Sequence, residues 1–228
     1  MNAYAISDIH GCHRTFRALL DRLSLTTGDQ LFLLGDFVNK GPDARGVLDT
    51  ILELRQHGHE VHCIRGNHDE VLLDLQVNKR YRRAPQIFGA HHTLKSFGVD
   101  RAEDIPAPYL EFLEELDTWM SWENYLFVHA GFSFLPDSPF HDTYAHTHIR
   151  TWYHQLNYHW LGDRYIIHGH VQHTREQIEW NLTKLPELRV LGIDAGCVSV
   201  WEPGKGHLCA LDLRQHACIF QGNLDYGS

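Results

Sequence analysis

Cysteine is scarce in this chain, and no two cysteines have the CxxC spacing of a zinc or redox motif. The five cysteines are spread over the 228 residues: Cys12, Cys63, Cys197, Cys209 and Cys218. An odd, scattered set indicates reduced thiols and argues against a disulfide framework. Cys12 follows a glycine at an expected helix start, but no base is evident beside it, so a nucleophilic cysteine is disfavoured.

Long apolar runs are missing as well. No stretch approaches the ~20 residues that a membrane-spanning helix needs. The N-terminus lacks the basic segment and apolar core of a secretory signal. We therefore expect a cytoplasmic protein with no membrane partner.

Positive charge is in deficit, since the formal net charge is −9. This balance disfavours a nuclease or any other protein whose main partner is nucleic acid. It does not exclude an anionic substrate, because bound cations can invert the local field. The 43% share of hydrophobic residues and the length of 228 residues predict one folded domain that spans 1–228.

Histidine, by contrast, is abundant at 19 residues, and several histidines follow short apolar runs. Six such runs lie at 3–6, 31–34, 61–64, 125–128, 165–167 and 190–193. In the same order, they are followed by Asp8 with His10; Asp36; Asn67 with His68; His129; His168 with His170; and Asp194. Open α/β sheets bind ligands at the carboxyl ends of their strands. Each segment alone is weak, but together they predict a metal centre of oxygen and imidazole ligands, which suits Mn²⁺, Fe or Zn²⁺ better than Ca²⁺. Such a centre indicates metal-assisted hydrolysis.

The N-terminal part of the chain predicts strands that alternate with helices. Strands are expected at 3–7, 31–34 and 61–64, with helices at 13–23 and after Gly41-Pro42-Asp43. This alternation implies parallel strands joined by right-handed crossovers.

The middle of the chain has no strand pattern. Helices are expected at 69–77, 86–98 and 108–118, so that about 74–118 forms a helical insertion. A basic cluster in this insertion consists of Arg80, Arg82 and Arg83. The cluster either helps to hold an anionic substrate or is a solvated helix face, and the second interpretation is favoured.

Short strands return in the second half. A hairpin is expected at 119–128, and further strands are expected at 165–168, 189–193, 198–201 and 207–212, the last two joined by a turn at 202–206. The predicted fold class is α/β with mixed sheets. It is a β-sandwich of the four-layer type, flanked by helices, with a dinuclear metal site at the C-terminal ends of its strands.

Several strand-end segments resemble the signature motifs of a known family. They are Asp8-Ile9-His10-Gly11, Gly35-Asp36-Phe37-Val38-Asn39-Lys40-Gly41, Arg65-Gly66-Asn67-His68-Asp69, His129-Ala130-Gly131, Gly169-His170 and Gly192-Ile193-Asp194-Ala195-Gly196-Cys197. The family is that of the calcineurin-like metallophosphoesterases. Within it, the motifs are most similar to the phosphoprotein phosphatase branch, which includes bacterial Ser/Thr phosphatases and symmetrical diadenosine tetraphosphatases. The resemblance runs from about residue 3 to 213, and only the helical middle carries no motif.

The resemblance implies a set of ligands for two divalent metal ions. They are Asp8 and His10 for one ion, Asp36 as the bridge, and Asn67, His129 and His170 for the other. His170 is preferred to His168 because the family's ligand directly follows the glycine of a Gly-His pair. Mn²⁺ is the first expectation for both ions, with Fe or Zn²⁺ as alternatives.

The same resemblance implies a reaction. A hydroxide that bridges the metals attacks phosphorus. His68 either protonates the leaving oxygen or only supports the residues that bind the metals. Lys40 and Arg150 would bind the phosphate, with Arg164 as the rival of Arg150. The preferred substrate is a phosphomonoester, above all on a phosphorylated protein of the Ser/Thr type. The alternatives are a dinucleoside polyphosphate such as diadenosine tetraphosphate and, third, a metal-binding role with catalysis weakened.

Two residues depart from the family pattern. Asn39 and Lys40 stand where the family has aspartate and arginine. Because the carboxylate is missing, we expect His68 to have a lower pKa and to be a weaker acid donor. Lys40 offers a point charge in place of a planar, bidentate clamp. These changes predict a slower enzyme, or one whose substrate has an easier leaving group.

Replacing Asn39 with aspartate is expected to raise turnover on an alkyl phosphate ester, because the new carboxylate would orient His68 and favour its charged form. Initial rates of phosphate release by the metal-loaded wild type and by the Asn39→Asp variant test this expectation. An unchanged or lower rate for the variant would contradict it.

Overall fold

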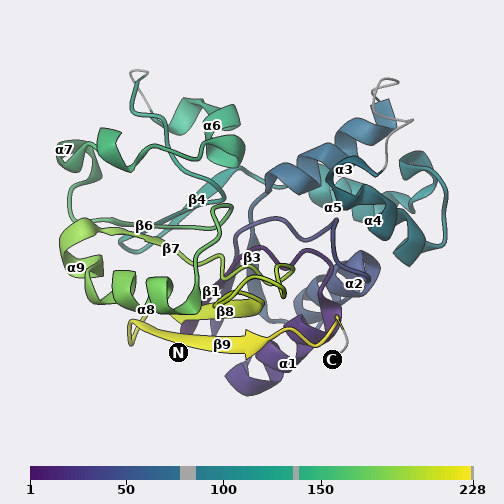
Figure 1. Cartoon of the computed structure of the whole chain (residues 1–228), viewed down its shortest axis with the longest axis horizontal. Helices are drawn as coiled ribbons and strands as arrows, with labels where there is room; N and C mark the ends of the chain where they lie inside the picture. The colour runs from purple at the N-terminus through teal and green to yellow at the C-terminus, as the bar shows by residue number, and fades with distance from the viewer. Residues whose placement is uncertain (78–85, 136–138, 227–228) are drawn as a thin grey trace.

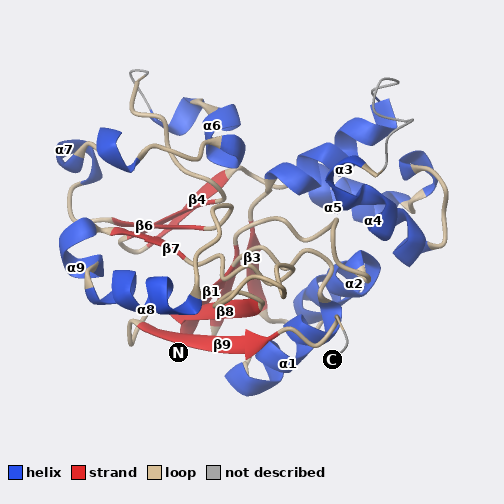
Figure 2. Cartoon of the chain, in the orientation of Figure 1, coloured by secondary structure: helices blue, strands red, loops and turns tan. Residues whose placement is uncertain are grey.

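The structure is a computed structural model that describes residues 1–77, 86–135 and 139–226. Two mixed β-sheets lie face to face, and helices cover the outer sides (Figure 2). This arrangement of helices, sheet, sheet and helices confirms the predicted class of a mixed α/β sandwich. Within the described ranges, none of the helices combines the length and the apolar content that crossing a bilayer requires.

The larger sheet has the strand order β3-β2-β1-β8-β9. Its strands are β1 (Ala3–Ile6), β2 (Gln30–Leu33), β3 (Glu60–Cys63), β8 (His207–Asp212) and β9 (Ala217–Gly222). The first three are parallel and are joined by α1 (His13–Leu23) and α2 (Ala44–Gln56), which confirms the β-α-β-α-β order predicted for the N-terminal part. β8 runs antiparallel to β1, and β9 antiparallel to β8.

The smaller sheet has the order β4-β5-β6-β7. Its strands are β4 (Trp119–Trp122), β5 (Tyr125–Val128), β6 (Tyr165–His168) and β7 (Val190–Gly192). β4 and β5 form the predicted hairpin, and β5, β6 and β7 are parallel. Both sheets therefore present the carboxyl ends of three parallel strands.

Side chains that alternate along each strand pack the two sheets together. In β1, Ala3 faces the other sheet, whereas its neighbour Tyr4 packs with the helices on the outer side. At the centre of the contact, Phe32 of β2 and Phe127 of β5 are buried and stacked, with ring centroids 4.5 Å apart. Burying a side chain of this kind contributes about 1.5–3 kcal/mol, so this contact fixes how the two sheets face each other.

Helices fill the segment between β3 and β4. They are α3 (Asn67–Val77), the single turn η1 (Ile87–Gly89), α4 (Ala90–Phe97), η2 (Ala102–Asp104) and α5 (Ala107–Glu114), and they form the lobe on the right of Figure 1. The helix expected at 86–98 is divided, because Phe88 and Gly89 both have positive φ. Outside the described residues lies the predicted basic cluster of Arg80, Arg82 and Arg83.

The helices of the second half cover the smaller sheet. They are α6 (Thr143–His148), α7 (Tyr158–Leu161), α8 (Arg175–Thr183) and α9 (Leu185–Leu188), with the single turns η3 (Pro139–His141) and η4 (Tyr153–Gln155). Trp152 and Leu161 pack on the outer face of this sheet. Ile178 and Leu185 close the gap between the two sheets at one side.

One expectation about the C-terminal strands is wrong. Residues 198–201 are not a strand that pairs with β8 but part of a series of turns, in which Ser199 N donates to Gly196 O and Glu202 N to Ser199 O. The strand that pairs with β8 is β9, which the sequence pattern does not reveal. β9 lies at the edge of its sheet and is mostly half-buried, so its apolar residues do not form a clear alternating pattern.

The C-terminal segment supplies a cap for α1. Cys12, at the N-cap position of this helix, makes no side-chain hydrogen bond to it. Instead, the Asp225 carboxylate accepts hydrogen bonds from Arg14 N at 3.0 Å, Thr15 N at 3.0 Å and Thr15 Oγ1 at 2.6 Å. Figure 1 shows the C-terminus next to the start of α1. A distant carboxylate thus satisfies backbone donors that a helix leaves unpaired at its N-terminus.

Removing this cap is expected to destabilise the whole fold. Asp225→Ala should lower the free energy of unfolding by about 1–2 kcal/mol, as for the loss of a helix N-cap. Urea denaturation followed by far-ultraviolet circular dichroism measures the change, and Asp225→Asn, which keeps one acceptor oxygen, is the matched control and should lose less. An unchanged denaturation midpoint for Asp225→Ala would contradict the expectation.

Candidate metal centre

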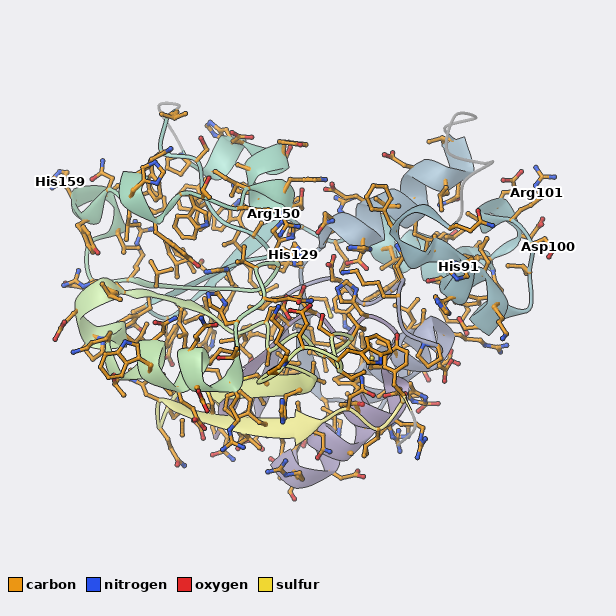
Figure 3. All side chains as sticks on the ribbon, viewed as in Figure 1. His91, Asp100, Arg101, His129, Arg150 and His159 are labelled. Carbon is orange, nitrogen blue, oxygen red and sulfur yellow. The ribbon has the colours of Figure 1, made fainter. Side chains whose placement is uncertain are left out.

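Polar residues at the strand ends gather at one edge of the sandwich. Asp8 and His10 follow β1, Asp36 follows β2, and His129 follows β5. A backbone hydrogen bond from Gly169 N to His129 O joins two of these loops at 2.8 Å. His129 lies near the middle of the molecule, where its two lobes meet (Figure 3). The packing of the two sheets therefore brings together segments that are far apart in the sequence.

Asp36 lies at the centre of the cluster. Its Oδ2 is 3.4 Å from His10 Nε2, and its Oδ1 is 3.5 Å from His129 Nε2. Its Oδ1 also accepts a hydrogen bond from His68 N at 2.8 Å. All of these side chains are buried. One carboxylate thus faces two groups of candidate ligands, one on each of its oxygens.

The other predicted ligands flank Asp36 on these two sides. On one side, Asp8 Oδ1 is 3.8 Å from His10 Nε2. On the other, Asn67 Oδ1 is 3.1 Å from His129 Nε2 and 2.9 Å from His170 Nδ1. The two sides are linked, because Asp8 Oδ2 accepts a hydrogen bond from His170 N at 3.0 Å. The structure therefore places all six sequence-predicted ligands in one cluster, in which Asn67 is half-buried and the other five are buried.

Backbone carbonyls hold the ring nitrogens that point away from Asp36. His10 Nδ1 contacts Val38 O at 3.2 Å, and His129 Nδ1 contacts Leu34 O at 2.8 Å. A carbonyl can only accept, so each Nδ1 carries the proton. Nε2 is then the ring nitrogen that each histidine directs at Asp36, which is the usual arrangement of histidines that bind metal ions.

The geometry and chemistry of the cluster fit divalent cations. Ligand atoms of two triads, which share Asp36, lie within 4.8 Å of one another: His10, Asp36 and His68, and Asp8, Asp36 and His129. Asp8 Oδ1 is buried and has no hydrogen-bond partner in the described part of the chain. An unsatisfied buried acceptor costs about 1–3 kcal/mol, or more if it is charged, and a cation would offset this cost. The donors therefore suit a pair of metal ions, without fixing which metal.

Burial and mutual charge set the protonation of the cluster. Burial raises the pKa of Asp8. Burial also favours the neutral form of Asp36, but the nearby charges of His129 and His68 outweigh it and hold the pKa of Asp36 below its usual range. Burial lowers the pKa of His170 to about 3, so this imidazole is neutral near pH 7. Neutral imidazole is the form that binds a metal.

Strained backbone and a second carboxylate hold Asp36 in place. Asp36 has a φ of 55°, in the left-handed region that non-glycine residues rarely adopt. Asp69 fixes this turn by accepting hydrogen bonds from Asp36 N, Phe37 N and Gly66 N at 2.9, 3.0 and 2.9 Å. Gly66 is required here, because a Cβ at this position would overlap Asp36. Asp69 is a functional residue that the sequence pattern did not reveal, although it directly follows Gly66-Asn67-His68.

Asn39 contacts His68 through its amide nitrogen. Its Nδ2 donates to His68 O at 3.0 Å and lies 3.4 Å from His68 Nδ1, while its Oδ1 accepts from Thr93 Oγ1 at 3.0 Å. The opposite orientation of the amide would place two acceptor oxygens against each other. Asn39 thus presents a donor to His68, not an acceptor. For Asn39→Asp to raise turnover, the new carboxylate must accept a hydrogen bond from His68 Nδ1 and avoid repulsion by the carbonyl oxygen of His68.

An open cavity of about 340 Å³ leads to the cluster, and the predicted phosphate-binding residues line it. Lys40 and Arg150 are among them, and Lys40 Nζ is 2.9 Å from His10 Nε2. In Figure 3, Arg150 and His129 are both labelled near the middle of the molecule. The rival Arg164 is elsewhere, because its guanidinium stacks on Trp160 and is bonded to nearby backbone carbonyls.

His168 is also placed outside the cavity. Its Nε2 lies 2.6 Å from Tyr153 Oη, and its Nδ1 contacts Gly169 O at 2.9 Å. Both ring nitrogens are therefore occupied by protein groups. Asp194 and Lys205 line the cavity together with His170. Asp194 is a candidate ligand from the strand-end pattern that the family resemblance did not assign to either metal, whereas Lys205 had no signal in the sequence.

Loss of the Asp69 carboxylate is expected to loosen the centre. In Asp69→Asn, the side-chain NH₂ group would face one of the three backbone N–H donors and could not accept its hydrogen bond. The substitution should therefore lower the free energy of unfolding by about 2–3 kcal/mol. Urea denaturation and equilibrium dialysis with Mn²⁺ measure stability and metal affinity. Asp74→Asn, an exposed substitution on the same helix, is the control. Wild-type values for the Asp69 variant would show that this anchor is dispensable.

Comparisons with known proteins agree with this geometry. A family model described as calcineurin-like phosphoesterase matches residues 1–197. A relative from Nitrosomonas europaea, named symmetrical bis(5'-nucleosyl)-tetraphosphatase, is 38% identical over 132 residues, which cover 58% of this chain and 45% of the relative. A relative of the same name from Aromatoleum aromaticum is 42% identical over 137 residues, with 58% and 44% covered. The chain thus spans about half the length of the curated relatives that it matches.

Among solved structures, the chain resembles a protein serine/threonine phosphatase from Saccharomyces cerevisiae. The TM-score is 0.72 with 13% identity, and the match covers 100% of this chain and 82% of that one. At this identity the likeness concerns the fold alone. The match of the family model, by contrast, covers most of the chain and includes all six predicted metal ligands. The chain therefore belongs to the family of calcineurin-like phosphoesterases, which are metal-dependent hydrolases.

Proposed function

We propose that this chain is a metal-dependent hydrolase of dinucleoside polyphosphates. The observation that carries the proposal is the buried cluster around Asp36, at the end of a cavity whose lining includes the cations Lys40, Arg150 and Lys205. Two relatives with 38% and 42% identity are named symmetrical bis(5'-nucleosyl)-tetraphosphatases. The sequence alone ranked a phosphorylated protein above such a substrate, and the named relatives favour the reverse order.

Six residues would hold the two cations. Asp8 and His10 would bind one, Asp36 both, and Asn67, His129 and His170 the other. When bound, such a pair of cations lowers the pKa of water between them and offsets charge on the phosphoryl oxygens. Mn²⁺ is the metal to test first, with Fe and Zn²⁺ as alternatives, since the donors are mixed oxygen and nitrogen atoms.

Cationic side chains would position the polyphosphate. The lining of the cavity contains three cations, Lys40, Arg150 and Lys205, and three carboxylates, Asp8, Asp36 and Asp194. Metal ions held by the carboxylates would add positive charge to the cations, and the cavity would then attract an anionic substrate although the chain has a formal net charge of −9. Arg150 can bind two oxygens of one phosphate, and Lys40 adds a point charge beside His10.

His68 would supply a proton to the leaving oxygen. It lines the cavity, and Asn39 contacts its Nδ1 with a donor, which leaves the proton on Nε2. Asn39 brings no negative charge that would favour a protonated His68. A diphosphate leaving group needs less help from an acid than the alkoxide of a serine side chain does, because it is itself a more acidic group. This departure from the family pattern therefore favours an anhydride substrate.

The proposed reaction consumes one water molecule for each substrate. The oxygen of water bonds to a phosphorus atom in the centre of the tetraphosphate, and the bond from that phosphorus to the bridging oxygen breaks. The products are two nucleoside diphosphates, and the bridging oxygen leaves with one of them. No other reactant is needed.

Parallel assays distinguish the candidate substrates. Protein loaded with Mn²⁺ is expected to release ADP from diadenosine tetraphosphate faster than phosphate from a serine phosphopeptide, and EDTA should abolish both activities. Asp36→Asn should lower the rate by at least about 10²-fold, because the shared ligand is altered. Chromatography of nucleotides and a phosphate assay follow the two reactions.

The exposed substitution Asp163→Asn is the control and should keep the wild-type rate. Cleavage of the phosphopeptide alone would restore the ranking made from the sequence. If metal binds but neither substrate nor an aryl phosphate is cleaved, the third interpretation, a metal-binding protein with weakened catalysis, becomes the better one.

A further inference from the structure

A second cavity adjoins the candidate metal centre. It has a volume of about 680 Å³, and its lining includes Arg14, Trp201, Lys205 and Tyr226. Two contacts connect it with the first cavity. Lys205 lines both cavities, and Tyr226 Oη donates a hydrogen bond to Lys40 O at 3.0 Å. A ligand that reaches from the metal centre past Lys205 would therefore enter this space.

The wall of this cavity carries an aromatic surface that the fold does not use. Trp201 is 79% exposed, so it contributes little to the core. Its ring lies 5.7 Å from that of Tyr226, at an angle of 51°. An exposed indole beside a second aromatic ring offers a surface on which a planar ligand can stack.

The loop that carries Trp201 is held firmly in place. Within the turns described above, Lys205 N donates to Glu202 O at 3.1 Å, and Gly206 N donates to Gly196 O at 3.0 Å. Asn223 N then ties this loop to the C-terminal segment through Gly206 O at 2.9 Å. The indole is therefore presented by a backbone that is closed by hydrogen bonds, and little ordering would be needed on binding.

Charge in this cavity suits an anion. Arg14 and Lys205 are the cations of its lining. Lys205 is paired with Glu202, so the two charges partly offset each other, and the Asp225 carboxylate caps α1. No ion pair of the Arg14 guanidinium occurs among the residues that the structure describes. An aromatic surface beside an unpaired guanidinium is the chemistry that recognises a nucleotide, through stacking of the base and contacts to phosphate.

We propose that this second cavity binds one nucleoside of a nucleoside polyphosphate, with the base stacked on Trp201 and the phosphates running past Arg14 and Lys205 to the metal centre. This inference rests on the proposed function, which places the phosphates of the substrate at the metal centre. It adds a specificity-determining residue, Trp201, which contacts the base and takes no part in bond breaking. Small phosphoesters would not reach it.

The test compares a substrate that has a base with one that does not. With Mn²⁺ bound, Trp201→Ala should raise the KM for diadenosine tetraphosphate about tenfold, as expected for the loss of one stacked base, and leave kcat and the hydrolysis of p-nitrophenyl phosphate within about twofold of wild type. Trp201→Phe keeps a ring and should recover most of the affinity. Trp180→Ala, which removes an exposed indole from α8, is the matched control and should change neither substrate.

A binding measurement separates failure of this inference from failure of the proposed function. Calorimetric titration of the Mn²⁺-loaded protein with ADP should give a Kd that Trp201→Ala weakens about tenfold and Trp180→Ala does not. If wild type binds ADP in this way but does not cleave the dinucleotide, the proposed function fails and the nucleotide site stands. If Trp201→Ala leaves both the KM and the ADP affinity unchanged, or impairs both substrates equally, the site is overturned, and docking of another protein on Trp201 becomes the better explanation for its exposure.

Discussion

The arrangement of this protein depends on a carboxylate that is buried between imidazoles. Moving a charge out of water costs several kcal/mol, and Asp36 offsets this cost through His10, His129 and the backbone amide of His68. None of these partners is near it in the sequence. They meet only because the two sheets pack face to face with the ends of their parallel strands at one edge. The polar cluster thus depends on the packing between the sheets, including the stacked pair Phe32 and Phe127. A shift of one sheet against the other would separate the candidate ligands.

The proposed function requires an acidic protein to take an anionic substrate. Carboxylates and cations lie together in the cavity at the candidate metal centre, so bound metal ions would have to supply much of the positive charge there. Lys205 belongs to the linings of both cavities and connects this region with the surroundings of Trp201. In the proposed reaction, small differences beside the centre would decide the choice of substrate. Asn39, which is uncharged, would make His68 less suited to expelling an alkoxide than a diphosphate.

Local patterns in the sequence predict the fold well where strands are buried on both faces. The runs at 3–6 and 31–34 are strands for this reason, and the ligands that follow them can be found because a strand that ends at a sheet edge must deliver its next residues there. β9 escapes detection because it is half-buried at an edge, and 198–201 has apolar residues that serve a cavity wall instead of a sheet. Hydrogen bonds that reach across the chain, such as those of Asp69 and Asp225, are set by tertiary structure and leave no local pattern. The choice between Arg150 and Arg164 likewise needs the cavity itself.

The order of strands in the larger sheet has a consequence for synthesis on the ribosome. β1 is synthesised well before β8, yet one of its edges pairs with β8, where Tyr4 lies opposite Asp212. Until β8 appears, that edge offers unpaired amides and carbonyls to any other extended segment. Contacts so distant along the chain also form slowly. We therefore expect β1 and its neighbours to be the part of the nascent chain that most needs protection by chaperones. The sheet is complete only when β8 and β9 have paired.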